Sequence, residues 1–305
     1  NNSDSKLLFT IDSFLDKFLK VNKTSIEKII REMLDGLSVN YIEHDRQQIH
    51  PLELDFYLPD YKLGIECNGI WWHCGEKSLN RHITKYNKCK EQGIRLLYFW
   101  ENDIHERTEL IKNYIKSILG MNNRIYARNC IVKEIDSKTS KDFINNNHMQ
   151  GNINASIKLG LYNNDNLVQV MTFGSLRKNL GQKSETGTYE LYRLCSLGGN
   201  TIIGGASKLL NYFIKIYKPK RIVSYCSKNI SNGNVYEKLG FKYIKDCGVG
   251  YCYINRYSGE MKNRYALRKD VVDDGSGRTA DEINESNGWC KCYDLGNKKY
   301  EIIIK

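Results

Sequence analysis

The sequence has 305 residues, of which 41% are hydrophobic, and a formal net charge of +11 with a pI near 9.0. This length predicts two domains, and the apolar content and three prolines exclude a disordered or collagen-like chain. The sequence shows no long uncharged apolar run and no signal-peptide pattern, so we expect a cytoplasmic protein without a membrane partner. The excess of Lys and Arg favours a polyanionic partner, nucleic acid above all, although a solvated basic surface is the alternative.

The first 120 residues predict a compact α/β unit. An apolar stripe at helical spacing predicts a helix over residues 24–37, and further helices are predicted at Ser78–Gln92 and Asp103–Leu119. Extended segments are predicted at Asn40–His44, Leu52–Leu58, Lys62–Asn68 and Ile94–Trp100. Pro59 and Asp60 form a turn signal between two of these strands.

The second half predicts another α/β domain, over residues 121–305, after a short linker at Met121–Arg124. Helices are predicted at about Gly204–Tyr217 and Asn232–Leu239. Val271–Ser286 is polar, and its Asp-Asp-Gly-Ser-Gly stretch at 273–277 is predicted to be a loop. Strands are predicted at Ile125–Glu134, Ala155–Tyr162, Leu167–Phe173, Tyr189–Cys195, Arg221–Cys226, Phe241–Tyr243, Tyr251–Asn255 and Tyr300–Ile304.

The ten cysteines do not form a zinc-binding pattern. No Cys-x-x-Cys pair occurs, and the spacing of Cys290 and Cys292 is too short for a zinc finger. We therefore expect a reduced chain without disulfides.

Two carboxylates in the first half are placed to share a metal ion. A hairpin puts Asp55 on one strand and Glu66 on the next, and alternation sends Glu66 and Asn68 to the same face. Convergent carboxylates suit Mg²⁺, which prefers oxygen ligands and can activate a water for attack on a phosphodiester. The alternative is that these acids are solvated residues on a strand face.

Residues 24–118 resemble the Vsr-like branch of the PD-(D/E)XK nucleases, including related homing endonucleases with an E-D-x-H-D pattern. The resemblance rests on four elements in order: Glu27 on the first helix, D55-F-Y-L-P, E66-C-N-G-I-W-W-H73 and G93-I-R-L-L-Y-F-W-E. It implies a restriction-endonuclease-like fold and cleavage of DNA.

The resemblance also implies a role for each matching residue. Asp55 would be the main ligand of Mg²⁺, for which Mn²⁺ could substitute, and Glu66 with the carbonyl of Cys67 would complete the protein ligands. His73 would be the general acid or base. Glu27 would position a water, although Glu32 competes for this part and either acid can be a solvated helix residue.

This sequence departs from the family at two positions. Asn68 stands where the family has a histidine or lysine, and it could only orient water or phosphate. His82 stands where the following helix often has an acid. Lys85, one turn on, is a phosphate-contact candidate or a solvated lysine, and Trp71 with Trp72 is either a wedge between base pairs or part of the core.

Part of the second half resembles a GNAT-type acetyltransferase. The matching segments are I202-I-G-G-A-S-K-L-L-N-Y-F, R221-I-V-S-Y-C and N232-G-N-V-Y-E-K-L-G-F241. A glycine-rich turn at a helix start can receive a pyrophosphate on its backbone amides. The whole arrangement resembles phage-encoded proteins in which a Vsr-like nuclease precedes such a domain, which implies action in the host bacterial cell.

Three hypotheses remain for the second half. The first is a platform that contacts double-stranded DNA, with the candidate residues Arg128, His148, Gln150, Arg177, Lys178 and Arg193. The second is an acyltransferase acting on a nucleobase, as a phage DNA-modification domain of similar fold does, with acyl-CoA as its ligand and Glu190 or His148 as its base. The third is an inert scaffold. We favour the platform, because a homing-type nuclease needs contacts over a long site.

The sequence thus predicts a metal-dependent endonuclease that hydrolyses double-stranded DNA. The alternatives are a nucleic-acid-modifying acyltransferase and a mismatch-repair nickase. The target site, the number of metal ions, the choice between nick and double-strand break and the oligomeric state are left open.

Overall fold

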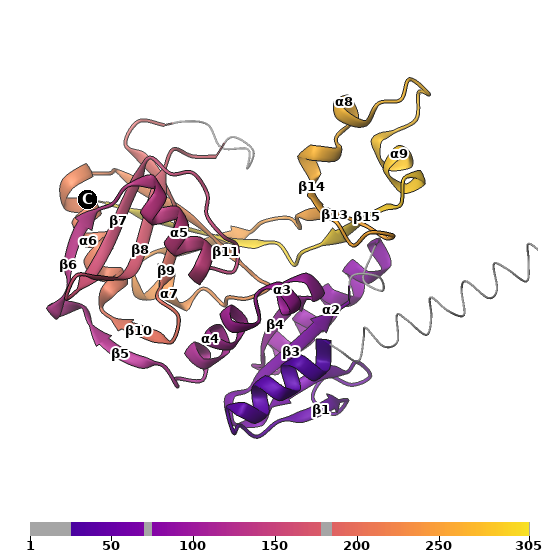
Figure 1. The fold of residues 1–305 in the computed structure, drawn as a ribbon, viewed down its shortest axis with the longest axis horizontal. Coiled ribbons are helices and arrows are strands. Elements are labelled where there is room, and N and C mark those ends of the chain that lie inside the picture. Colours follow the sequence, from indigo (N-terminus) through magenta and orange to yellow (C-terminus); the bar gives the residue numbers. More distant parts are fainter. Residues whose placement is uncertain (1–25, 70–74, 178–184, 305) are drawn as a thin grey trace, which may run out of the picture. The chain divides into compact units, whose positions relative to one another are not determined.

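The computed structural model describes residues 26–69, 75–177 and 185–304 (Figure 1). The chain divides into two compact units. Unit 1 comprises Asn1–Thr108 and Gly250–Asp294, and unit 2 comprises Glu109–Val249 and Leu295–Lys305. Compact units and functional domains need not coincide, so the boundaries 1–120 and 121–305 stay predictions.

Unit 1 is built on a four-stranded sheet with the order β1-β2-β3-β4. The strands are β1 (Ile42–Asp45), β2 (Leu54–Leu58), β3 (Leu63–Asn68) and β4 (Arg95–Trp100). The pairs β1–β2 and β2–β3 are antiparallel and β3–β4 is parallel. A parallel pair needs a crossover, which helix α2 (Glu76–Glu91) provides.

The apolar pattern of these strands explains their burial. All six residues of β3 and the four central residues of β4 are buried, as expected of adjacent strands covered on both faces. Residues 26–36 form a helix before the sheet, and α3 (Glu101–Glu106) and α4 (Thr108–Ile118) follow it. The predicted order of helix, three strands, helix, strand and helix is therefore confirmed.

The later segment of unit 1, Gly250–Asp294, carries its own three-stranded sheet with the order β14-β13-β15. Its elements are β13 (Tyr251–Asn255), β14 (Met261–Asn263), η4 (Arg264–Leu267), α8 (Lys269–Val272), α9 (Ala280–Ser286) and β15 (Trp289–Tyr293). The amide of Gly75 donates a hydrogen bond to the carbonyl of Lys291 at 3.0 Å, which ties the start of α2 to β15.

One expectation for this segment is confirmed and one is wrong. The loop predicted at residues 273–277 lies between α8 and α9. Thr279 accepts from the amide of Glu282, and the carboxylate of Glu282 accepts from the amide of Thr279, a reciprocal capping box that starts the helix. In addition, Cys290 is disulfide-bonded, so the chain is not free of disulfides in this structure.

Unit 2 is built on a seven-stranded sheet with the order β12-β16-β11-β9-β8-β7-β6. The strands are β6 (Ile131–Glu134), β7 (Ile157–Asn163), β8 (Asn166–Gly174), β9 (Thr188–Ser196), β11 (Arg221–Ser227), β12 (Lys242–Asp246) and β16 (Asn297–Ile303). Only β9 and β11 pair in parallel within this described sheet. A separate parallel pair joins β5 (Asn123–Tyr126) to β10 (Asn200–Ile203).

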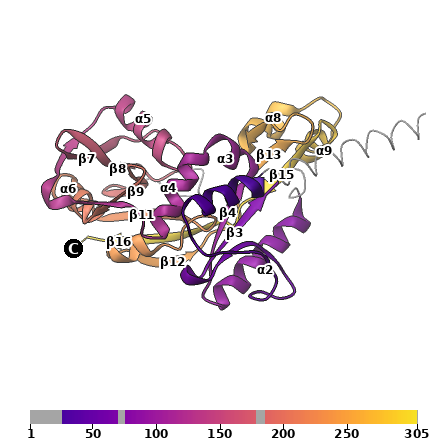
Figure 2. The same ribbon diagram turned by 60° about the horizontal axis from the view of Figure 1, so that its bottom comes forward.

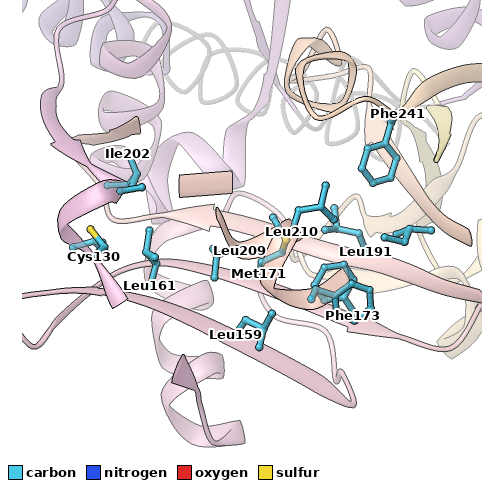
Figure 3. Close-up of a cluster of buried hydrophobic side chains, with 14 of the residues drawn as sticks. Cys130, Leu159, Leu161, Met171, Phe173, Leu191, Ile202, Leu209, Leu210 and Phe241 are labelled. Carbon is cyan, nitrogen blue, oxygen red and sulfur yellow. The ribbon is translucent and has the colours of Figure 1, made fainter. Parts of the chain in front are cut away.

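Helix α6 (Gly205–Tyr217) buries its apolar stripe against one face of this sheet. Leu209 and Leu210 lie beside Leu159 and Met171 in a cluster of buried side chains (Figure 3). The ring of Phe213 stacks on Phe173, with centroids 3.6 Å apart, so aromatic contact adds to the burial of apolar area.

Helix α5 (Ser137–Asn147) packs on the opposite face, where Ile144 contacts Val170 and Cys195. Because Val170 and Met171 are neighbours on β8, they point to opposite faces of the sheet. Asp136 begins α5 by accepting from the amides of Lys138 and Thr139. The short helix α7 (Asn234–Lys238) precedes β12.

The predicted fold class is confirmed: an α/β nuclease-like core precedes an α/β GNAT-like domain. Figure 2 shows strands β3 and β4 of unit 1 and strands β7, β8, β9 and β11 of unit 2 from a second direction. In the described ranges, no helix is long and apolar enough to cross a membrane.

Candidate functional site

The two predicted carboxylates lie at the end of the β2–β3 ladder. Phe56 pairs with Ile65, so Asp55 and Glu66 are the next residues on the two strands. Asp55 Oδ2 accepts from the amide of Cys67 at 2.7 Å, and the amide of Asp55 donates to Glu66 Oε1 at 3.3 Å. The structure therefore brings both carboxylates to one place.

The ammonium group of Lys85 on α2 pairs with Glu66 Oε2 inside unit 1. The Lys85 and Glu66 side chains are only 5% and 4% exposed. The pKa of Glu66 is raised to about 8, first by burial and then by the charge of Asp55, while Lys85 opposes the shift. Lys85 is thus buried in an ion pair, whereas the sequence offered only a phosphate contact or a solvated position.

Asn68 ends β3 with its side chain buried. Its Nδ2 donates to the carbonyl of Phe99 at a long 3.5 Å, and its Oδ1 has no hydrogen-bond partner in the part of the chain that the structure describes. A buried acceptor without a partner is costly unless a ligand or water satisfies it. Asn68 could therefore accept a hydrogen bond from a bound polar group, and its predicted role stays a prediction.

His82 lies one turn before Lys85 on α2 and is 4% exposed. The centroid of its ring is 5.3 Å from the ring centroid of Tyr98 and 6.0 Å from that of Trp100. Its Nε2 atom is 3.4 Å from Ser78 Oγ. Burial lowers the pKa of His82 to about 4, with Lys85 and Arg81 adding to the shift. His82 is therefore neutral near pH 7, and its catalytic role stays a prediction.

Glu27 lies on helix 26–36, and its charge acts on Cys67 of strand β3. Its side chain is 14% exposed, and its Oε2 is 3.8 Å from Nε2 of His44. The pKa of the Cys67 thiol is raised well above its usual value by burial and by the charges of Asp55, Glu66 and Glu27. Glu27 is thus within electrostatic range of the Cys67 thiol, and its role at the candidate site stays a prediction.

The described residues offer two carboxylates and backbone carbonyls to a metal ion. Among them, no group of three or more His, Cys, Asp or Glu side chains could hold an ion. Mg²⁺ does not need such a cage, because it keeps several waters and binds through one or two carboxylates together with substrate phosphate. The chemistry of the donor set therefore fits Mg²⁺ and does not fit a structural zinc site.

Four candidate residues lie outside the described ranges: Trp71, Trp72, His73 and Lys178. Their assignments stay predictions.

Unit 2 contains a cavity of about 430 Å³ that the sequence analysis missed. Strands β9 and β11 pair in parallel as far as Leu191 and Ser224, and the residues that follow on both strands line the cavity. Tyr192 and Ser196 come from β9, and Tyr225 comes from β11. Further lining comes from α4, the end of α5, residues 197–199, strand β10, the start of α6 and helix α7.

The cavity lining contains no Asp, Glu, Lys or Arg. Gln169 Oε1, Asn122 Oδ1 and the Tyr225 hydroxyl are buried without a hydrogen-bond partner in the described ranges. The other end of the Gln169 amide, Nε2, donates to Ser196 Oγ at 2.9 Å, which fixes its orientation. The cavity therefore offers hydrogen-bonding groups without formal charge.

The remaining DNA-contact candidates have mixed environments. The Arg177 guanidinium pairs with Glu190, which is fully buried, and lies over the rings of Tyr192 and Tyr225. Arg193 is half-buried and donates to the carbonyl of Gly151 at 2.8 Å. Three others lie on unit 2 with different exposure: Arg128 and Gln150 are exposed, and His148 is half-buried at the cavity.

The positive charge of the sequence is concentrated in unit 2. By sequence, unit 2 has 24 Lys and Arg against 10 Asp and Glu, a net charge of +14. Unit 1 has 22 against 25, a net charge of −3. A polyanion would therefore be attracted mainly by unit 2.

The site and the fold define a two-part α/β protein, with a carboxylate pair in one unit and a neutral cavity in the other. The sequence signature of the Mom protein family matches residues 129–289, just over half of the chain. The chain therefore belongs to the Mom protein family. No curated protein matches it by sequence.

Solved structures resemble parts of the chain. The catalytic domain of homing endonuclease I-Bth0305I is 25% identical over 31% of this chain and 93% of its own, with a TM-score of 0.28. A Bacillus subtilis acetyltransferase in complex with CoA is 12% identical over 58% and 98%, with a TM-score of 0.32. Arabidopsis thaliana Naa50, in complex with a bisubstrate analogue, is 16% identical over 58% and 99%, with a TM-score of 0.33. Because all three scores are low, the fold class rests on strand order and pairing.

Proposed function

We propose that this protein is a metal-dependent DNA endonuclease whose cutting site lies in unit 1. The observation that carries the proposal is the placement of Asp55 and Glu66 at one end of the β2–β3 ladder, joined through two backbone amides. The sequence resemblance to Vsr-like nucleases predicts the same two residues. The mixed four-stranded sheet supports the reading, because it presents both from rigid strands.

The residues around the pair have separable tasks. Asp55 and Glu66 would hold the divalent ion, which when bound neutralises charge at the phosphate and makes an attacking water more acidic. The amide of Cys67 fixes the orientation of the Asp55 carboxylate. Asn68 supplies an unsatisfied acceptor two residues beyond Glu66, and Glu27 adds negative charge beside Cys67.

Unit 2 would supply DNA binding in this proposal. Its net charge of +14 favours phosphate contacts, which provide most of the affinity for DNA. Unit 1, with a net charge of −3, has no comparable attraction for DNA before a metal ion binds.

A cleavage assay tests the proposal. Plasmid and phage DNA are incubated with the full chain in Mg²⁺, Mn²⁺ or EDTA, comparing wild type with Asp55→Asn and Glu66→Gln. Cleavage should require the metal and fall by roughly 100-fold or more in both variants, because metal-assisted stabilisation amounts to several kcal/mol. DNA binding in a gel-shift assay should persist.

The matched control is Asp60→Asn, an exposed acid in the same hairpin, which should cut like wild type. Equal cleavage by Asp55→Asn and wild type would place the site elsewhere. A strong preference for mispaired duplex would indicate a repair nickase.

A second function, transfer of an acyl group to a nucleobase, is favoured by a separate observation. The chain belongs to the Mom protein family, and its unit 2 has a cavity where β9 and β11 diverge. The orphan acceptors Gln169 Oε1 and Asn122 Oδ1 would suit a ligand that donates hydrogen bonds.

Calorimetry with acetyl-CoA separates the two functions. Heat of binding to wild type that is reduced in Gln169→Leu would support the acyltransferase. No heat at high protein concentration would remove acetyl-CoA as a ligand and leave the endonuclease as the proposed activity.

A further inference from the structure

We propose that Lys85 is an exchangeable counterion of the metal site: it holds Glu66 when no metal is bound, and it leaves Glu66 Oε2 when a divalent ion binds there. This inference rests on the proposed function and concerns the regulation of its site. It assigns to Lys85 a positioning role that neither a phosphate contact nor a solvated lysine would have.

Lys85 occupies a place at Glu66 that a metal ion would need. Glu66 has two carboxylate oxygens, of which Oε1 accepts from the amide of Asp55 and Oε2 accepts from Lys85 Nζ. A metal ion that used Oε2 would have to take the place of the ammonium group. The two cations therefore compete for one oxygen.

The charges of Asp55, Glu66 and Lys85 have to balance in a buried place. Asp55 and Glu66 carry two negative charges when both are ionised, and Lys85 supplies one positive charge beside them. A divalent ion would balance both carboxylates by itself and would repel a neighbouring ammonium group. The pair of carboxylates is thus suited to hold either Lys85 or a divalent ion, but not both.

The side chain of Lys85 can move while its backbone stays in place. Lys85 lies within α2, and its ammonium group is carried on a flexible four-carbon chain with three donors. Asn68 follows Glu66 by two residues, on the same face of the strand. Asn68 carries no charge and cannot replace Lys85 as a counterion, but its unsatisfied Oδ1 can accept a hydrogen bond.

Chemical labelling of wild-type protein tests the exchange directly. Lysines of the full chain are reductively methylated in EDTA and in Ca²⁺ or Mn²⁺ without DNA, and modification is read by peptide mass spectrometry. Lys85 should be protected in EDTA and several-fold more reactive with metal. Lys90, exposed on the same helix, should react equally in both conditions. Equal protection of Lys85 in both conditions overturns the proposal.

A second measurement uses Mn²⁺ binding by calorimetry. Lys85→Met should bind Mn²⁺ about tenfold or more tightly than wild type, because one competing unit charge is removed. Lys90→Met should bind like wild type, and Asp55→Asn should lose binding. Circular dichroism and thermal melting of each variant confirm folding before titration.

The outcomes separate this inference from the proposed function. If wild type and Lys85→Met bind Mn²⁺ equally and Asp55→Asn does not, the metal site stands and the exchange is wrong. Weaker binding by a folded Lys85→Met also overturns it, because Lys85 would then support the bound ion. If no variant binds Mn²⁺ and labelling is unchanged by metal, the metal site and the exchange both fail.

Discussion

Unit 1 and unit 2 distribute charge in opposite ways. Unit 1 has a slightly negative total but keeps three ionisable groups, Asp55, Glu66 and Lys85, together at its candidate site. Unit 2 is strongly positive, yet its cavity is lined by no Asp, Glu, Lys or Arg.

The difference shows that affinity and chemistry can be assigned to different parts of one chain. Surface charge attracts a polyanion over long range, whereas a few convergent groups select a metal or a small ligand. Three predictions test this contrast, beginning with the largest expected effect.

Buried His82 should make unit 1 sensitive to acid. Because its pKa is lowered from 6.5 to about 4, the folded state binds fewer protons than the unfolded state between these values. Stability should therefore fall as pH drops from about 6.5 to 4, by up to roughly 3 kcal/mol. Denaturant unfolding at several pH values gives the free energy of unfolding of wild type and of His82→Asn. The difference between their pH dependences is the contribution of His82.

The raised pKa of Glu66 acts in the opposite direction, since it costs stability as pH rises from 4.5 toward about 8. Both proteins contain Glu66, so the comparison isolates His82. Identical pH dependence in the two proteins would show that His82 titrates normally.

The start of α6 should tolerate no side chain larger than hydrogen. A Cβ on Gly205 would lie 2.2 Å from Gln169 Oε1 and 2.6 Å from Ile202 Cγ2. Gly205→Ala should therefore destabilise the protein by about 1–3 kcal/mol, measured by denaturant unfolding, because side chains around the cavity must shift.

The control is Gly36→Ala in unit 1, where a Cβ would meet no atom within 4 Å. This variant should be unchanged or more stable by about 0.5–1 kcal/mol, because alanine favours the helix. If Gly205→Ala were as stable as Gly36→Ala, the close contacts described around Gly205 would be contradicted.

Reversal of surface charge should weaken DNA binding more in unit 2 than in unit 1. Lys138→Glu with Lys141→Glu, both exposed on α5, should weaken binding of duplex DNA about tenfold at low salt and reduce the salt slope by about 2. The same change at exposed Lys28 and Lys90 of unit 1 should have a smaller effect. Fluorescence anisotropy across a salt series measures both, and equal losses would contradict a DNA-binding role confined to unit 2.

Local patterns were enough to predict most of the fold. Apolar periodicity and turn signals placed the four strands of unit 1, and the hairpin around Pro59 placed Asp55 opposite Glu66. The α9 helix could also have been found, because Thr279-Ala-Asp-Glu282 has the spacing of a capping box.

Long-range packing could not be predicted in the same way. Lys85 is 19 residues from Glu66, and their pairing depends on how α2 lies on the sheet. The cavity depends on where β9 and β11 stop pairing, which no local pattern gives. Inclusion of Gly250–Asp294 in unit 1 likewise depends on contacts between segments far apart in the chain.

The return of the chain to unit 1 has a consequence for biosynthesis. The polypeptide passes between the units after Thr108, after Val249 and after Asp294. On the ribosome, unit 1 cannot gain β15 until Tyr293 has been translated, so most of unit 2 emerges while unit 1 is still incomplete. A protease that cut at any single crossing would leave the units joined by the other two connections.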